Sequence, residues 1–418
     1  MVSAFPPGGA RAVARCDELG VAPYSDMRGG LYRGYLSPAY DATLERLGEW
    51  MAEAGLSVRR DPAANLVGRY EGAQADAPAL IIGSHIDSVR DGGRYDGPLG
   101  ITLGIECVDA LRREGRRLPF AIEIYGFGDE EGSRFPAAML TSRAVAGLLE
   151  PAALEIADGS GVALADAGVD VATYLEAGRA KREMLAYLEA HIEQGPVLED
   201  EGLAVGTVTG IAAQLRYAVT VKGTAGHAGT TAMRLRSDAL AGVAAMVLAV
   251  EQEARADKSD VVATVGSIEA KPGAANVIPG EVHFTIDVRS GEAARRDRVA
   301  EQILARIAEI AKARDLECTV DRIHDLPPSP CDPELMDLMD AATEDAGHPP
   351  YRLVSGAGHD AMNMAALGPI AMLFIRCKGG VSHNPAEHVE PADADVALRV
   401  MLAFIDRLAK DWKSRNAG

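Results

Sequence analysis

The chain has 418 residues, of which 48% are hydrophobic and 25% are charged, and its formal net charge at pH 7 is −19. This length allows two domains, and the composition is that of an ordinary globular protein. A net negative charge without a block of Lys or Arg argues against nucleic acids and anionic membranes as partners, because both bind positive surfaces. We therefore expect a small-molecule ligand.

No apolar stretch approaches the roughly 18 residues that a membrane span requires. The first residues, MVSAFPPGGARAVAR, lack the apolar core of a secretory signal, so we expect a cytoplasmic protein. The chain has five cysteines without a C-x-x-C pair, which argues against a disulfide framework and against a thiolate metal site.

The first half of the chain alternates predicted helices and strands. Apolar residues recur at helical spacing over 37–56, and the segment 57–70 has the composition of strands. A strand over 78–87, a helix over 99–115 and a strand over 120–132 follow. This alternation is typical of a parallel α/β sheet that binds ligands at the ends of its strands.

The pattern changes after HIEQGPVLEDEG, which ends at residue 202. Strands and helices are then predicted in the order β-α-β-β-α-β of a ferredoxin-like layer. These elements cover residues 215–221, 237–256, 261–269, 281–289, 292–314 and 316–323. A proline-rich link, DLPPSPCDPE, then returns the chain to an α/β pattern. We therefore predict a main domain formed by residues 1–212 and 327–418, with a second domain inserted at 213–326.

A cluster of histidine and aspartate follows the predicted strand at 78–87. The stretch GSHIDSVRDGGRYDG places His85, Asp87 and Asp96 in a glycine-rich segment that is either a surface turn or a metal site. His85 and Asp87 point to the same side of a strand, so Asp87 can hold one imidazole nitrogen while the other binds a cation. Gly92 and Gly93 let the loop fold back, so that the two oxygens of Asp96 can bridge two cations.

Other acids and histidines can complete such a site. Glu130 and Glu131 are adjacent at a predicted strand end, where neighbouring side chains diverge, so one can bind metal while the other acts as a general base. His191 in AHIEQGP and His383 in GGVSHNPAEH lie in unusual loops. The set suits two divalent ions such as Zn²⁺, Mn²⁺, Co²⁺ or Ni²⁺. Its members are His85, Asp96, Glu131, His191 and His383.

Seven motifs in order resemble one known family. They are SHIDSV…GGRYDGPLG, GDEEGSRF, HIEQGPVLE, AGHAGTT, NVIPG, SGAGHDA and SHNPAE. Together they resemble the carbamoylase and allantoate amidohydrolase branch of the M20 metallopeptidase-like amidohydrolases, over nearly the whole chain. The resemblance implies an α/β catalytic domain with a mixed sheet flanked by helices, and an inserted ferredoxin-like α+β domain for dimerisation or as a lid. Dipeptidase-like relatives tend to have an acid at the position of His191, so HIEQG favours the ureido-hydrolysing branch.

The resemblance also implies a role for each site residue. One metal would be held by His85, Asp96 and His191, and the other by Asp96, Glu131 and His383. The catalytic residues would be Glu130 as the base, Asp87 and His227. The substrate contacts would be Gln194, His227, Asn276, Arg289, Gly358 and His359, and His227 would serve the site of the other subunit of a homodimer.

The residues themselves support some of these roles. In the predicted strand EVHFTIDVRS, apolar residues alternate with polar ones, and Arg289 lies on the polar face. A guanidinium there can bind a carboxylate through two parallel hydrogen bonds. His359 can either touch substrate or orient a loop of ligands, while Gly356 and Gly358 serve the turn.

The expected function is metal-dependent hydrolysis of the ureido C–N bond of allantoate or an N-carbamoyl-L-amino acid, which releases ammonia and carbon dioxide. Glu130 would remove a proton from a water acidified by two divalent ions per subunit and pass it to the leaving nitrogen. One alternative is an N-acyl-amino-acid or dipeptide hydrolase of the same fold. Another is a metal-dependent binding protein without turnover, which the presence of both Glu130 and Glu131 disfavours.

Overall fold

The computed structural model describes residues 6–74 and 77–415, which divide into two compact units. Unit 1 comprises the chain up to residue 209 together with 331–353 and the chain from 358 onward. Unit 2 comprises residues 210–330 and 354–357. The sequence did not predict that residues 354–357 group with unit 2. No helix among the described residues is long and apolar enough to cross a membrane.

The larger sheet has the strand order β1-β2-β4-β3-β5-β16-β6-β14, and β15 also pairs with β6. Its strands are β1 (Ser57–Arg60), β2 (Leu66–Tyr70), β3 (Ala79–His85), β4 (Ala121–Phe127), β5 (Met184–Ile192), β6 (Val205–Ile211), β14 (Ser329–Pro330), β15 (Arg352–Ser355) and β16 (Ile370–Ile375). The neighbours β4, β3, β5 and β16 are parallel, while β1, β2, β6 and β14 pair antiparallel. The prediction of a mixed sheet flanked by helices is therefore confirmed.

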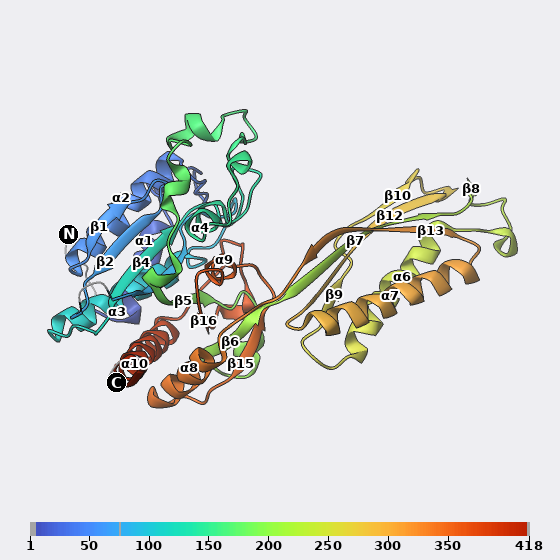
Figure 1. The fold of residues 1–418 in the computed structure, drawn as a ribbon. Coiled ribbons are helices and arrows are strands. Elements are labelled where there is room, and N and C mark those ends of the chain that lie inside the picture. The colour runs from blue at the N-terminus through green and yellow to red at the C-terminus, as the bar shows by residue number, and fades with distance from the viewer. Residues whose placement is uncertain (1–5, 75–76, 416–418) are drawn as a thin grey trace. The chain divides into compact units, whose positions relative to one another are not determined.

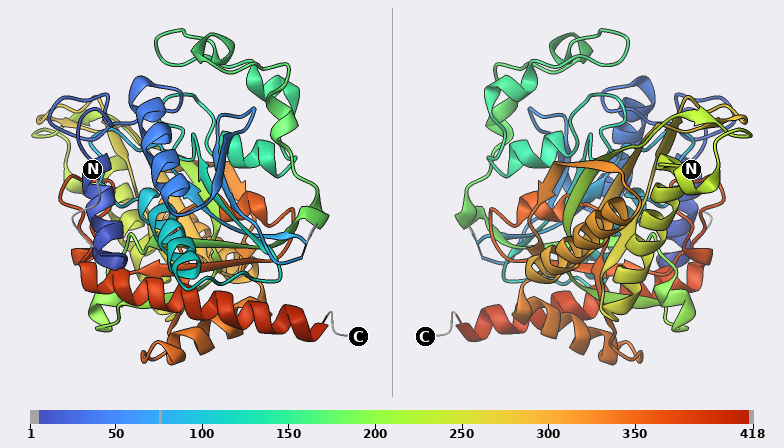
Figure 2. Two further views of the ribbon diagram at one scale, coloured as in Figure 1. Left: turned by 90° about the vertical axis from the view of Figure 1, so that its left-hand side faces the viewer. Right: turned by 90° about the vertical axis from the view of Figure 1, so that its right-hand side faces the viewer.

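Helices cover this sheet in unit 1 (Figures 1 and 2). They are α1 (Gly9–Leu19), α2 (Pro38–Glu53), α3 (Pro98–Arg113), α4 (Leu140–Val145), α5 (Val197–Asp200), α8 (Pro333–Asp345), α9 (Ala361–Met364) and α10 (Pro391–Arg415). α3 packs on β3, β4 and β5, and α1 and α10 pack against α3. α9 packs on β5 and β16. Every residue of β3, β4 and β16 is buried, as expected for central strands that are covered on both faces.

The segment between β4 and β5 was not predicted in any detail. Besides α4 it contains short 3₁₀ helices, at Pro151–Leu154, Leu164–Ala167, Tyr174–Ala177 and Lys181–Glu183. Such short turns have no extended apolar periodicity, so the sequence pattern does not reveal them. The hydroxyl of Tyr174 lies 3.0 Å from that of Tyr35 and joins this segment to the residues before α2.

Unit 2 contains an antiparallel sheet with two helices, α6 and α7, side by side on one face (Figure 1). Its elements are β7 (Ala213–Lys222), α6 (Ala239–Ala256), β9 (Val262–Thr264), β10 (Ile268–Lys271), β12 (Glu281–Ser290), α7 (Ala293–Ala313) and β13 (Glu317–Leu326). The strand order is β10-β12-β7-β13, with β9 also paired to β12. Val282, Phe284, Ile286 and Val288 of β12 are buried, so the predicted alternation along this strand is confirmed.

The predicted strand over 261–269 is wrong as a single element. β9 pairs with β12 at Asp287–Arg289, whereas β10 pairs with it at Glu281–Phe284, and residues 265–267 separate the two strands. A second small feature of unit 2 pairs β8 (Gly226–His227) with β11 (Val277–Ile278).

Candidate metal centre

The candidate ligands of unit 1 lie at or beyond the carboxyl ends of four neighbouring strands. β3 ends at His85, and β4 ends three residues before Glu130. His191 lies inside β5, so the prediction that it lies in a loop is wrong. His383 lies in the segment that follows β16. Because these strands are parallel neighbours, their carboxyl ends meet at one edge of the sheet, where α/β folds bind ligands.

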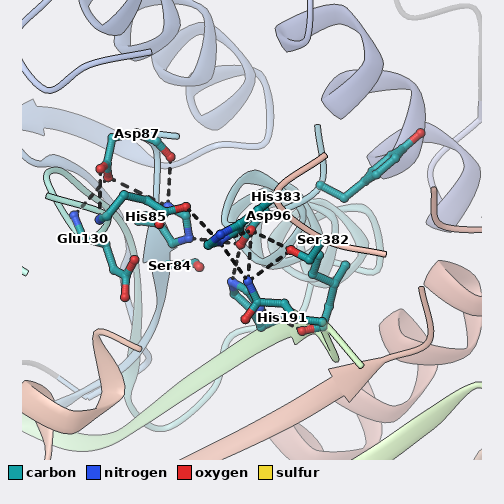
Figure 3. Close-up of polar contacts among 12 residues, drawn as sticks. Ser84, His85, Asp87, Asp96, Glu130, His191, Ser382 and His383 are labelled. Carbon is teal, nitrogen blue, oxygen red and sulfur yellow. Dashed lines mark hydrogen bonds and ion pairs between the residues drawn. The ribbon is translucent and has the colours of Figure 1, made fainter. Parts of the chain in front are cut away.

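Asp96 lies at the centre of the cluster (Figure 3). Its Oδ1 is 3.1 Å from Nε2 of His191 and 3.4 Å from Nε2 of His85, whereas its Oδ2 is 3.3 Å from Nε2 of His383. Nε2 of His383 is in turn 3.4 Å from Oε1 of Glu131. The two oxygens of Asp96 therefore face different histidines.

Among the described residues, three groups of donor atoms lie within 4.8 Å of one another. They are His85, Asp96 and His191; Asp96, Glu131 and His383; and His85, Glu130 and Glu131. The first two groups contain the residues that the sequence suggested for two metal ions, and they share Asp96. That these groups bind metal stays a prediction.

Backbone carbonyls fix the orientation of two of the imidazoles. Nδ1 of His85 lies 2.9 Å from the carbonyl oxygen of Asp87, and Nδ1 of His191 lies 2.9 Å from that of Ile192. A carbonyl only accepts, so each Nδ1 is the donor, and in the neutral ring Nε2 then has a lone pair directed at the centre. The buried Nε2 of His191 has no hydrogen-bond partner, although it lies beside an oxygen of Asp96.

These facing lone pairs test whether the residues fit a metal. An imidazole lone pair and a carboxylate oxygen at 3.1 Å repel each other unless a cation or a proton lies between them. Imidazole nitrogens and carboxylate oxygens are ligands of Zn²⁺, Co²⁺, Ni²⁺ and Mn²⁺. The donor set and its orientation therefore fit divalent ions.

The predicted contact between the side chains of Asp87 and His85 is wrong in its atoms. Oδ1 of Asp87 is 3.8 Å from Nδ1 of His85, and the backbone carbonyl of Asp87 makes the hydrogen bond instead. The carboxylate of Asp87 accepts from the backbone N–H groups of Glu130 and Glu131, at 3.1 Å each. Asp87 thereby fixes the two acids as well as one histidine.

Both glutamates have a raised pKa, but the extent and the causes differ. Burial raises the pKa of Glu130 well above its ordinary value, and the nearby carboxylates of Glu131, Asp360 and Asp87 raise it further against the opposing effect of His85. Burial, followed by the charge of Asp96, raises the pKa of Glu131 to about 7. No group in residues 6–74 or 77–415 hydrogen-bonds to the carboxylate of Glu130. A carboxylate with a raised pKa and no hydrogen-bond partner is suited to accept a proton.

Other buried groups around the centre were missed from the sequence. Glu189 accepts hydrogen bonds from the hydroxyls of Ser84 and Tyr187, at 3.0 Å each, and from the backbone N–H of Ala361 at 3.1 Å. Burial and the charge of Glu189 raise the pKa of Asp360 to about 8. The signal for Glu189 was an acid inside the apolar run LAYLEAHI, which in a central strand must be buried.

The candidate substrate contacts of unit 1 have different surroundings. Nε2 of Gln194 donates to Oδ2 of Asp96 at 3.0 Å. His359 is buried, with its ring centroid 4.6 Å from that of His191 and 5.8 Å from that of Phe374. Gly358 is exposed. His359 therefore packs against the candidate ligand His191, and its contact with a substrate stays a prediction.

The other three candidates belong to unit 2. His227 and Asn276 are neighbours, because β8 pairs with β11 and the carbonyl of Asn276 accepts from the N–H of Ala228 at 2.9 Å. Both side chains are exposed. Arg289 makes hydrogen bonds to Oδ1 and Oδ2 of Asp287 at 2.7 and 3.1 Å, and its Nη1 donates to the carbonyl of Gly356 at 2.5 Å.

Residues 81–407 match the peptidase family M20/M25/M40. The chain belongs to this family. It is similar to the N-carbamoyl-L-amino acid amidohydrolase of Geobacillus stearothermophilus, with 41% identity over 91% of this chain and 94% of that protein. It is also similar to the allantoate deiminase of Arabidopsis thaliana, with 38% identity over 94% of this chain and 81% of that one.

Solved structures agree with this assignment. A hydantoinase/carbamoylase family amidase from Burkholderia multivorans matches with a TM-score of 0.88 and 33% identity, over 96% of this chain and 98% of that chain. This member of the M20 family is accordingly a hydrolase that acts on amide-type C–N bonds.

We expect metal binding to release protons and to strengthen with rising pH. The contact with Asp96 raises the pKa of His383 to about 9, from an ordinary value of 6.5, so at pH 7 an ion must displace a proton from this imidazole. In the metal-free protein the same raised pKa contributes stability that is complete below pH 6.5 and is lost as the pH rises through about 9. Between these values the thermal midpoint of the metal-free protein should therefore fall while the affinity for Mn²⁺ rises. Calorimetry in buffers of different ionisation enthalpy measures the released protons, and an affinity that does not change with pH would contradict the expectation.

Proposed function

We propose that the chain hydrolyses the ureido C–N bond of allantoate or of N-carbamoyl-L-amino acids, releasing ammonia and carbon dioxide. The relatives named for these two substrates support the proposal. The observation that carries it is the position of Asp96, whose oxygens face two groups of donors next to the partly buried carboxylate of Glu130. A carboxylate whose two oxygens face two groups of donors, next to a second carboxylate that could act as a base, would suit hydrolysis assisted by two ions.

Two divalent ions per subunit would be held by His85, Asp96 and His191, and by Asp96, Glu131 and His383. When bound, such ions lower the pKa of water and stabilise negative charge on a carbonyl oxygen. Zn²⁺ or Mn²⁺ is proposed, and Co²⁺ and Ni²⁺ suit the same donors.

Glu130 is proposed as the general base and then the general acid. Its carboxylate takes the proton of the attacking water and passes it to the nitrogen that leaves. Its raised pKa favours the first transfer, because a more basic carboxylate holds the proton more strongly. The carboxylate of Asp87 supports this role because it accepts a hydrogen bond from the backbone N–H of Glu130 and so holds that residue in position.

Four side chains are proposed to bind the substrate. Arg289 would hold its carboxylate, Asn276 and Gln194 would donate to its polar groups, and His227 would stabilise the developing oxyanion in the active site of the other subunit. Because Asp287 already engages Nε and Nη2 of Arg289, a substrate carboxylate competes with that pair or replaces the contact of Nη1 with Gly356.

We propose a cytoplasmic homodimer.

The test is hydrolysis of matched compounds by the purified protein with added Mn²⁺ or Zn²⁺. Allantoate and several N-carbamoyl-L-amino acids would be compared with the N-acetyl and N-glycyl derivatives of the same amino acids. We expect ammonia release from at least one ureido compound, with kcat/KM well above that for the acetyl and dipeptide analogues. Hydrolysis of the acetyl or dipeptide compounds alone would overturn the substrate class.

A further inference from the structure

Glu387 holds the backbone of Asp96, although 291 residues separate them along the chain. Its Oε1 accepts hydrogen bonds from the N–H groups of Tyr95 and Asp96, at 2.9 and 3.1 Å. The side chain is buried, with Glu387 only 5% exposed. It belongs to the motif SHNPAE, of which the proposed function uses only His383.

The hydroxyl of Ser382 lies between the other oxygen of Glu387 and the carboxylate of Asp96, and its single O–H donates to one of them at a time. Its Oγ lies 3.2 Å from Oε2 of Glu387 and 3.0 Å from Oδ2 of Asp96 (Figure 3 labels Ser382 and Asp96). Asp96 is thus held at its backbone by Glu387 and at one oxygen by Ser382. The held oxygen, Oδ2, faces His383, which leaves Oδ1 toward His85 and His191.

Gly93 shows how closely Glu387 approaches the loop that bears Asp96. A Cβ at Gly93 would lie 2.0 Å from Cδ of Glu387, and its three nearest atoms would all belong to Glu387. The φ angle of Gly93 is not in the left-handed region, so the backbone itself tolerates a side chain there. Glu387 is therefore the group that requires glycine at this position.

From these contacts we propose that Glu387 and Ser382 are positioning residues that set Asp96 to bridge two metal ions. The inference rests on the proposed function for the two ions, and it assigns roles to residues outside both groups of donors. Residues that hydrogen-bond to a metal ligand and fix its orientation do not touch the ion. Removing such residues nevertheless lowers the metal affinity. The carboxylate of Asp96 faces both groups of donors. Removing Glu387 or Ser382 should therefore weaken the binding of both ions.

The experiment measures the affinity of the metal-free protein for Mn²⁺ and Zn²⁺ by competition with a chelator. We expect Glu387→Ala to weaken the binding of both ions by about 10- to 100-fold. Glu387→Gln should restore most of the affinity, because its amide oxygen can accept from the same two N–H groups. The control is Glu390→Ala, which removes an exposed carboxylate of the same segment that pairs with His388, and it should bind both ions like the unmodified protein.

A double-mutant cycle with Gly93 separates positioning from general damage. Gly93→Ala alone should weaken the binding of both ions about as much as Glu387→Ala does. In the double variant the additional loss of affinity should be small, because the atoms of Glu387 that the new Cβ would meet are absent. A merely structural role would instead lower the thermal midpoint of the metal-free chain and leave the affinities unchanged. If Glu387→Ala does not fold, Ser382→Ala carries the test with the same expected direction.

The outcomes for this inference and for the proposed function are distinct. Unmodified protein that binds neither ion would contradict the proposed function and, with it, this inference. Unmodified protein that binds two ions, together with a Glu387→Ala protein of equal affinity, would overturn only the positioning role. The positioning role would also be overturned if the losses of metal affinity caused by Gly93→Ala and Glu387→Ala were additive in the double variant.

Discussion

Replacing Glu130 by glutamine is expected to lower kcat by at least about a hundredfold while both metal ions stay bound. The amide cannot accept the proton of water, so the step that Glu130 is proposed to perform is lost. The side chain keeps its size, and the backbone N–H that donates to Asp87 is unaffected. Steady-state kinetics and elemental analysis of the same preparation measure the two quantities.

The matched control is Glu131→Gln, which changes the neighbouring acid in the same way. Oε1 of Glu131 lies 3.4 Å from Nε2 of His383, so this variant should lose metal along with activity. If Glu130→Gln lost metal and Glu131→Gln retained it, the roles of the two acids would be reversed.

A heterodimer of two inactive chains is expected to recover about half of the unmodified activity, because one of its two sites is complete. One chain would have Glu130→Gln and an intact His227, and the other would have His227→Ala and an intact Glu130. Each homodimer lacks one group in every site and should be nearly inactive if His227 serves the other subunit. Coexpression with two different affinity tags yields the heterodimer, and mass spectrometry confirms its composition.

The same experiment tests the alternative in which both residues serve one chain. A heterodimer would then have no complete site, and it would be no more active than the two homodimers. Size-exclusion chromatography with light scattering must first show a dimer. A monomeric protein with full activity would contradict the proposal that His227 acts across an interface.

Three candidate site residues of unit 1 could be placed together from the sequence because each lies near the end of a strand with a clear apolar pattern. The runs ALII and AIEIYGF predict central strands, and parallel central strands bring the residues that follow them to one edge. His85 lies three residues after the first run, and Glu130 and Glu131 lie three and four residues after the second. The pattern therefore predicts that these three side chains lie at one edge of the sheet, whereas the assignment of residues to two ions is what the family resemblance implies.

Contacts between distant segments could not be predicted. Glu387 and Asp96 are joined by a hydrogen bond over 291 residues, and no spacing in the sequence indicates it. The hydrogen bond of His85 to the carbonyl of Asp87 was missed for a different reason, since β3 ends at His85 and strand geometry does not extend to residue 87. The break at 265–267 was missed because both short strands have strand composition and pair with the same partner.

The most direct test of a centre that shares Asp96 between two ions is titration of the metal-free protein with Mn²⁺ or Zn²⁺ while hydrolysis of the best ureido substrate is followed. We expect no hydrolysis without metal and a rise in activity that ends at two equivalents per chain. Asp96→Ala should bind neither ion tightly, whereas His383→Ala should retain the ion held by His85, Asp96 and His191. Full activity of the metal-free protein, or equal metal loss in the two variants, would contradict the shared centre.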